Sequence, residues 1–244
     1  MKITRKAWEA YVYKLRKISD AAADAMWQWL KENGTDSVEA AVLYAKTLSG
    51  TYGEAAGALA CEMYDGIAAA YGVTVPAAEP AEIDYEAVEA AARATLLKTP
   101  ATLPAVIARE VKQVSADTML RNAARDGAEF AWVPSGDTCA FCITLASRGW
   151  QRQSKKAAQR HASHIHTNCD CNYAVRFGGS SGVGGYDPDK YLERYQNADG
   201  GTPQAKINAM RREQYAANAE EINARKRINY ADRNARKAAE EAET

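Results

Sequence analysis

Four of the five cysteines and all three histidines of this chain lie in or just upstream of two short segments. The first segment holds Cys139 and Cys142, and the second runs from His164 to Cys171. Thiolates and imidazoles in closely spaced pairs are the donors that a tetrahedral zinc ion requires. The two segments together therefore predict a metal site.

The predicted ligand set draws on both segments and consists of Cys139, Cys142, His166 and Cys169, with Cys171 as the substitute for either of the last two. A Cys-x2-Cys pair allows two sulfurs to reach one ion at about 2.3 Å each. The second segment and its upstream flank offer more donors than one ion can use, because His164 lies in the segment and His161 just before it. Thiolate-rich sites are normally closed, so we expect a structural zinc ion.

Two alternatives concern the cysteines alone. Cys139 and Cys142 follow a predicted strand and open a predicted helix, which is also the setting of a thioredoxin-like redox pair. That interpretation gives no role to Cys169, Cys171 or the histidines. A disulfide framework is disfavoured, because the N-terminal segment lacks the apolar stretch of a signal peptide and we expect a reducing compartment.

A catalytic alternative is a nuclease of the His-Asn-His kind, since His164, His166 and Asn168 lie near basic residues. Asp170 is the only acid close to them in sequence. The His-x-Glu of nucleotide deaminases and the His-Glu-x2-His of zinc hydrolases do not occur in this arrangement. We therefore expect no enzymatic activity, with a metal-dependent nuclease or a DNA-binding protein as the alternative.

The charges balance over the whole chain, with 31 Lys and Arg against 31 Asp and Glu. This balance argues against global attraction to nucleic acid or to an anionic membrane. Basic residues nevertheless exceed acidic ones between residues 137 and 177. The candidates for contact with DNA are Arg148, Arg152, Lys155 and Lys156. Such a run is more often a solvated surface.

The apolar spacing predicts a mainly α protein with a small α+β zinc-binding module. Helices are expected up to Gly34, over residues 36–72 with an interruption at Ser49-Gly50, and over 84–97 and 104–125. Strands are expected at 129–133 and 172–177, on either side of the ligand cluster. The short helix between them would be capped by Asp137 or Thr138.

The expected organisation is a helical domain over 1–125, a Cys/His zinc-knot module over 126–177, a Gly-rich linker over 178–202 and a polar helix over 203–244. The apolar residues of the last helix are sparse, so it would dock on a partner or project into solvent. No apolar run reaches the length of a membrane span.

The run Trp132–Trp150, followed by His164–Cys171, resembles the core of tailed-phage minor capsid proteins, the MuF-like head morphogenesis family. That family shows a Cys-x2-Cys, a glycine shortly after it, and then His-x-Asn-Cys-x-Cys. The positions that match this pattern are Cys139, Cys142, Gly149, His166, Asn168, Cys169 and Cys171. The resemblance covers residues 132–177.

This resemblance implies a virion component present in few copies, in the capsid interior or at the portal vertex, and assembled in the host cytoplasm. Its partners would be phage portal and capsid proteins, and it would act in procapsid assembly or DNA packaging. Packaged DNA is a candidate further partner. The resemblance gives no reason to expect a membrane or a small-molecule substrate.

Overall fold

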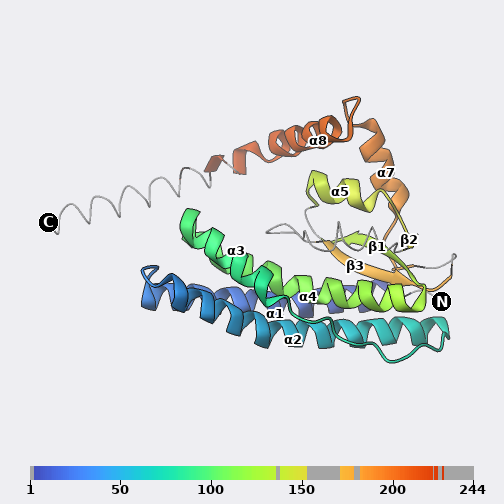
Figure 1. Cartoon of the computed structure of the whole chain (residues 1–244). Helices are drawn as coiled ribbons and strands as arrows, with labels where there is room; N and C mark the ends of the chain where they lie inside the picture. Colours follow the sequence, from blue (N-terminus) through green and yellow to red (C-terminus); the bar gives the residue numbers. More distant parts are fainter. Residues whose placement is uncertain are drawn as a thin grey trace.

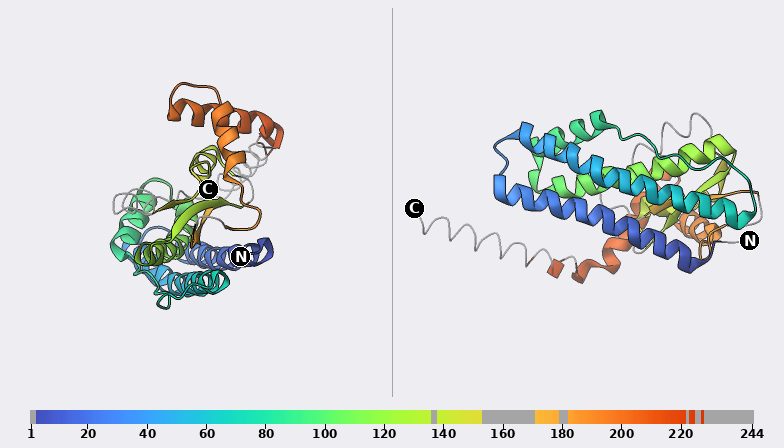
Figure 2. Two further views of the ribbon diagram at one scale, coloured as in Figure 1. Left: turned by 90° about the vertical axis from the view of Figure 1, so that its right-hand side faces the viewer. Right: turned by 90° about the horizontal axis from the view of Figure 1, so that it is seen from below.

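The structure is a computed structural model that describes residues 3–135, 138–152, 171–178, 182–221, 223–224 and 227. Long helices form one side of the molecule and a small antiparallel sheet packs on them (Figure 1). A short helix and a C-terminal helix pair lie on the opposite side of the sheet (Figure 2). The sheet is therefore enclosed between two helical layers.

The helical side is built from α1 (Arg5–Asn33), α2 (Val38–Tyr71), α3 (Tyr85–Lys98) and α4 (Leu103–Asp126), with the 3-10 turn η1 (Pro100–Thr102) before α4. The side chains of Thr4, Ser37 and Asp84 accept backbone N–H groups at the starts of α1, α2 and α3. Glycines with positive φ follow the ends of α1, α2 and α4. These helices confirm the sequence prediction, because capping residues and glycines mark helix ends.

The expected interruption of α2 at Ser49-Gly50 is wrong, because the helix runs unbroken from Val38 to Tyr71. Ser49 and Gly50 are both buried in this helix. A Cβ atom at Gly50 would lie 2.9 Å from the Tyr85 hydroxyl oxygen, and one at Gly53 would lie 3.1 Å from Ile83. The glycines serve close packing here and do not end the helix.

An extended strap, residues 73–84, connects α2 to α3 and lies between the two helices that the sequence predicts at 36–72 and 84–97. Side chains of α2 and α4 hold its main chain. Asn122 accepts from the N–H of Glu79 at 3.0 Å and donates to the carbonyl of Glu79 at 2.8 Å. Thr118 accepts from the N–H of Ala81, and Asp65 accepts from that of Ala78. The strap thus gains hydrogen bonds that an extended segment cannot make within itself.

The sheet contains β1 (Glu129–Pro134), β2 (Gln151–Arg152) and β3 (Cys171–Arg176), and its order in the described residues is β2-β1-β3. Both neighbours of β1 are antiparallel to it. The strands β1 and β3 lie where the sequence predicts strands, whereas the two-residue strand β2 was not predicted. A mainly helical fold with a small α+β part is thereby established.

On the other face, within the described residues, α5 (Ala140–Ala146) packs against β1, and α7 (Pro188–Asn197) and α8 (Pro203–Ala217) pack on α5. Helix α7 lies inside the range expected to be a Gly-rich linker. Helix α8 packs on α5 through a small apolar cluster, whose buried members are Ala140, Ile143, Ala198, Ile207 and Met210. The sparse apolar residues of α8 suffice for this contact because α5 is only seven residues long.

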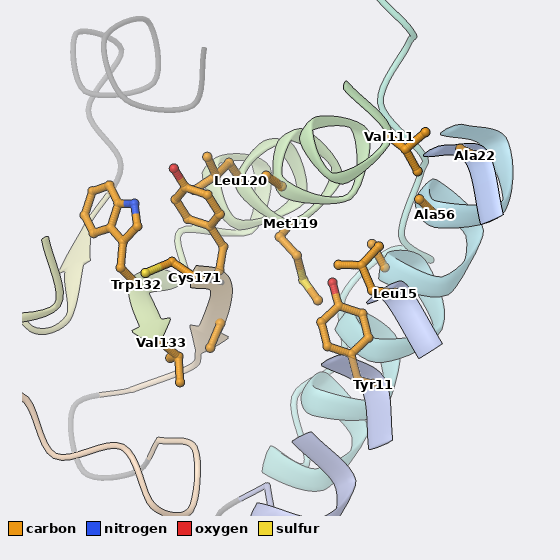
Figure 3. Packing of buried hydrophobic residues seen from close by; sticks show 14 of the residues in the cluster. Tyr11, Leu15, Ala22, Ala56, Val111, Met119, Leu120, Trp132, Val133 and Cys171 are labelled. Atoms are coloured by element: carbon orange, nitrogen blue, oxygen red, sulfur yellow. The ribbon is translucent and has the colours of Figure 1, made fainter. Parts of the chain in front are cut away.

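The main core extends from α1, α2 and α4 into the sheet without a break. Figure 3 shows Tyr11 and Leu15 of α1, Met119 of α4 and Val133 of β1 within this cluster. Tyr11 and Ser115 share a hydrogen bond of 2.7 Å between their buried hydroxyl groups. Among the described helices, none is both long and apolar enough to cross a membrane.

Candidate metal centre

The pairing of β1 with β3 brings Cys171 near the segment that leads to the Cys-x2-Cys pair. Cys171 opposes Pro134 at the last position of the ladder. The chain leaves β1 at Pro134 and enters α5 at Ala140, with Cys139 immediately before that helix. Cys171 and the segment that leads to Cys139 therefore lie at the same end of the sheet.

Cys139 is itself the N-cap of α5, which corrects the prediction of Asp137 or Thr138 at that position. Its Sγ atom accepts a hydrogen bond of 3.4 Å from the backbone N–H of Cys142. The Cys139 sulfur can act as the cap because the backbone of Cys139 is extended (φ −66°, ψ 157°), which points its side chain back over the first turn of α5. An N–H donor stabilises a thiolate, the form that binds a metal ion or reacts as a nucleophile.

Cys142 and Cys171 are buried, with 2% and 6% of their surfaces exposed, and both belong to the main apolar core. Figure 3 shows Cys171 beside Trp132 at the edge of that core. Burial raises the pKa of the Tyr191 hydroxyl, and the nearby Cys171 raises it further. A buried thiolate is costly without a counter-charge, which a bound cation would supply.

The described cysteines do not complete a metal site by themselves. Among the residues that the structure describes, no group of three His, Cys, Asp or Glu side chains is arranged to hold an ion. The described cysteines are Cys61, Cys139, Cys142 and Cys171, and each is free of disulfide bonds. The predicted ligands His166 and Cys169, together with His161, His164, Asn168 and Asp170, lie outside the described residues.

The start of α5 is held by a side chain far away in the sequence. Gln214 of α8 donates from Nε2 to the carbonyl of Thr138 at 2.6 Å. Its Oε1 atom accepts from the N–H of Ala140 at 3.0 Å. The Gln214 amide therefore binds the main chain on both sides of Cys139, and it fixes the position of that sulfur. Nothing in the local sequence marks Gln214 for this role.

The end of α5 is held by the segment before α7. The Tyr186 hydroxyl donates to the carbonyl of Ala146 at 2.8 Å. The Tyr186 ring packs edge-on against Trp150, with centroids 5.7 Å apart. Trp150 in turn carries the Arg176 guanidinium over its face, and Arg176 pairs with Glu129 across β1 and β3 at 2.6 Å. Both ends of the cysteine-bearing helix are thus tied to the rest of the molecule.

The basic candidates are only partly described. Arg148 follows α5 and Arg152 ends β2, and both side chains are exposed. Lys155 and Lys156 lie outside the described residues. The structure therefore places two guanidinium groups on the surface near the end of α5 and β2.

A family model described as VG15 protein matches residues 2–198. The chain belongs to this family. VG15 proteins are phage and viral gene products, so this chain is a phage-associated protein. The match spans the helical side, the sheet, both cysteine segments and α7, and it ends before α8. No curated protein and no solved structure matches the chain.

Proposed function

We propose that this VG15 protein is a minor capsid protein of the head morphogenesis kind, associated with the portal and acting in procapsid assembly or DNA packaging. A structural zinc ion would join the two cysteine segments, with ligands from Cys139, Cys142, His166 and Cys169 or Cys171. Its partners would be portal and capsid proteins, and it would reside in the virion without catalysing a reaction.

The observation that supports this proposal is that the chain leaves β1 toward Cys139 and enters β3 at Cys171 at the same end of the sheet, next to a run that resembles the MuF-like motif. Membership of a phage protein family also supports a role in the phage particle. The two buried cysteines and the N–H bond to Cys139 suit a closed, structural site. A closed site holds a surface in place and leaves no open position for a substrate.

The zinc part is tested by elemental analysis of protein purified without added metal. We expect about one zinc ion per chain, lost in Cys139→Ser and in His166→Ala. His166→Cys should keep the ion, because a thiolate can replace the imidazole. Cys61→Ser on α2 is the matched control and should also keep it. Zinc-free wild-type protein, or full zinc content in Cys139→Ser, would contradict the site.

The assembly part is tested by co-expression with the portal and major capsid proteins of the same phage. The protein should co-sediment with procapsids or with the portal, and deletion of its gene should reduce the yield of filled heads. Purified protein incubated with duplex DNA and Mg²⁺, Mn²⁺ or Zn²⁺ should leave the DNA intact. Cleavage that His164→Ala abolishes would replace the assembly proposal by the nuclease alternative.

A further inference from the structure

The hairpin formed by α1 and α2 carries opposite charges on its two helices. Residues 5–17 of α1 hold five bases and one acid. Residues 50–71 of α2 hold three acids, Glu54, Glu62 and Asp65, and no base. The two helices pack on each other and lie side by side (Figure 2). The hairpin is therefore basic along one helix and acidic along its neighbour.

The exposed charges on the two helices follow the same spacing. Lys6 and Lys14 are eight residues apart on α1, and Glu54 and Glu62 are eight residues apart on α2. All four residues are exposed. At a rise of 1.5 Å per residue, each pair spans about 12 Å along its helix. The row of lysines on one helix therefore matches the row of glutamates on the other in length and opposes it in sign.

A small residue occupies the middle of each row. Ala10 lies midway between the two lysines, and Ala58 lies midway between the two glutamates. Both alanines are exposed, and residues four apart share one face of a helix. Packed helices approach to about 8–10 Å, depending on the side chains at their contact. Alanine at the centre of each row permits the closer part of that range.

These charges are not used within the described part of the chain. The ion pairs among the described residues do not include Lys6, Lys14, Glu54 or Glu62. By contrast, the charges at the contact of α2 with α3 already form ion pairs inside the chain. The two rows of the hairpin are therefore available to a partner.

The basic and acidic stretches lie at the same height in the hairpin. The Trp29 ring of α1 stacks on the Tyr44 ring of α2, with centroids 5.6 Å apart. Because the two helices run antiparallel, equal steps from this pair place residues 6–17 level with residues 56–67 (Figure 2). A two-fold axis parallel to the helices would bring α1 of each copy against α2 of the other at that height. Such a contact closes on itself, because both halves are alike.

We propose that the α1–α2 hairpin is an interface with a second copy of this chain, in which the lysines of α1 face the acids of α2. The register places Lys14 nearest to Glu62 and Lys17 nearest to Glu54 of the second copy. A nucleic acid or an anionic surface would be repelled by α2, whereas a second copy offers both signs in the matching order. Exposed ion pairs contribute little each, so the dimer is weak and sensitive to salt.

Sedimentation velocity over a range of protein concentrations tests the interface. The wild type should dimerise in dilute salt, and its dissociation constant should rise at least about tenfold in concentrated salt. The double variants Lys14→Glu/Lys17→Glu and Glu54→Lys/Glu62→Lys should each remain monomeric. An equimolar mixture of the two variants should form a 1:1 heterodimer, because opposite signs then meet again at both halves of the contact.

The control variant is Lys190→Glu/Arg194→Glu on α7, which changes the net charge as much as the first double variant. It should dimerise as the wild type does. Far-UV circular dichroism like that of the wild type shows that each variant is folded. A wild type that stays monomeric in dilute salt, or folded variants whose mixture stays monomeric, would overturn the interface. Growth into longer polymers would overturn the two-fold arrangement. The readout involves neither portal protein nor zinc content, so its outcome is distinct from that of the proposed function.

Discussion

The strap packs on α2 and α4, and the C-terminal helices pack on α5, but the two are fixed in opposite ways. The strap is held by side chains of the long helices beneath it, among them the buried Thr118 and Asn122. Helix α5 is instead held by side chains of the covering segments, Gln214 and Tyr186. The long helices have a large core of their own, whereas α5 and α8 share a small apolar cluster. The cysteine side of the molecule, which consists of α5 with α7 and α8, therefore depends on a few contacts. A bound metal ion would add more to its stability than to that of the long helices.

The largest expected effect is on the strap side. Asn122→Ala removes the acceptor and the donor that pair with the main chain of Glu79. We expect the free energy of unfolding to fall by about 3 kcal/mol, because two main-chain groups lose their partners next to a buried side chain. Urea denaturation measures it. Asn33→Ala, at the exposed end of α1, is the control and should change stability by less than about 0.5 kcal/mol.

A second expected effect, in α4, is a dependence of the free energy of unfolding on pH through Asp117. Burial is the main cause that raises the pKa of Asp117 to about 6, and Glu110 and Asp84 add to it. The folded state then binds a proton more readily than the unfolded chain, whose aspartate has a pKa of about 3.9. The stability from this group is therefore present below about pH 4 and is lost as the pH rises through 6.

Asp117→Asn should accordingly raise the free energy of unfolding at pH 7 by about 2–3 kcal/mol and flatten its dependence on pH between 4 and 6. Asparagine can still accept the 2.9 Å hydrogen bond from Gln113 Nε2. Denaturation at several pH values checks this, with Asp24→Asn on α1 as the control. A variant that is less stable than the wild type at pH 7 would mean that the charged carboxylate is favourable there.

The C-terminal side should respond locally. Gln214→Ala leaves the N–H of Ala140 and the carbonyl of Thr138 without their partner. Amide hydrogen exchange in α5 and α8 should become faster by the equivalent of about 1–2 kcal/mol, while α2 and α4 keep their protection. Gln204→Ala, on the same helix but bound to the exposed Asn208, should change neither. An equal loss of protection against amide exchange in α2 would contradict the proposed difference between the long helices and the α5–α8 region.

The smallest expected change in stability concerns two glycines of α2, of which one packs against the strap and the other does not. Among the described residues, no atom lies within 4 Å of a Cβ placed on Gly66, so Gly66→Ala should stabilise the helix by about 0.5–1 kcal/mol. A Cβ on Gly53 would lie 3.1 Å from Ile83 of the strap and 3.2 Å from Val114. Gly53→Ala should therefore lose that gain, and thermal unfolding of the two variants measures the difference.

The helical side was largely predictable because its signals are local. Caps such as Ser37 and Asp84 and stops such as Gly72 and Gly127 lie next to the elements that they end. The error at Ser49-Gly50 arose because a glycine that breaks an exposed helix also permits close packing. That choice depends on Tyr85, which lies far from Gly50 in the sequence.

The cysteine side was predictable only in outline. Alternation marked β3, the short run that ends at Pro134 marked β1, and spacing marked the cysteines. Strand β2 consists of two residues that pair with Glu129 and Phe130, so no pattern of its own announces it. The roles of Gln214 and Tyr186 could not be predicted either, since the sequence around a glutamine or tyrosine in a polar segment does not indicate its hydrogen-bond partner. Their roles exist only once the chain has folded back on α5.

The bond between Gln214 and Thr138 also sets an order of events during synthesis, because 76 positions separate the two residues. A ribosome that adds about 5–20 residues per second needs several seconds to cover that distance. Throughout this interval the cysteine-bearing helix has been made but lacks the amide that will pin it. The proposed zinc ion would have this window in which to bind the nascent chain, before α8 docks on α5.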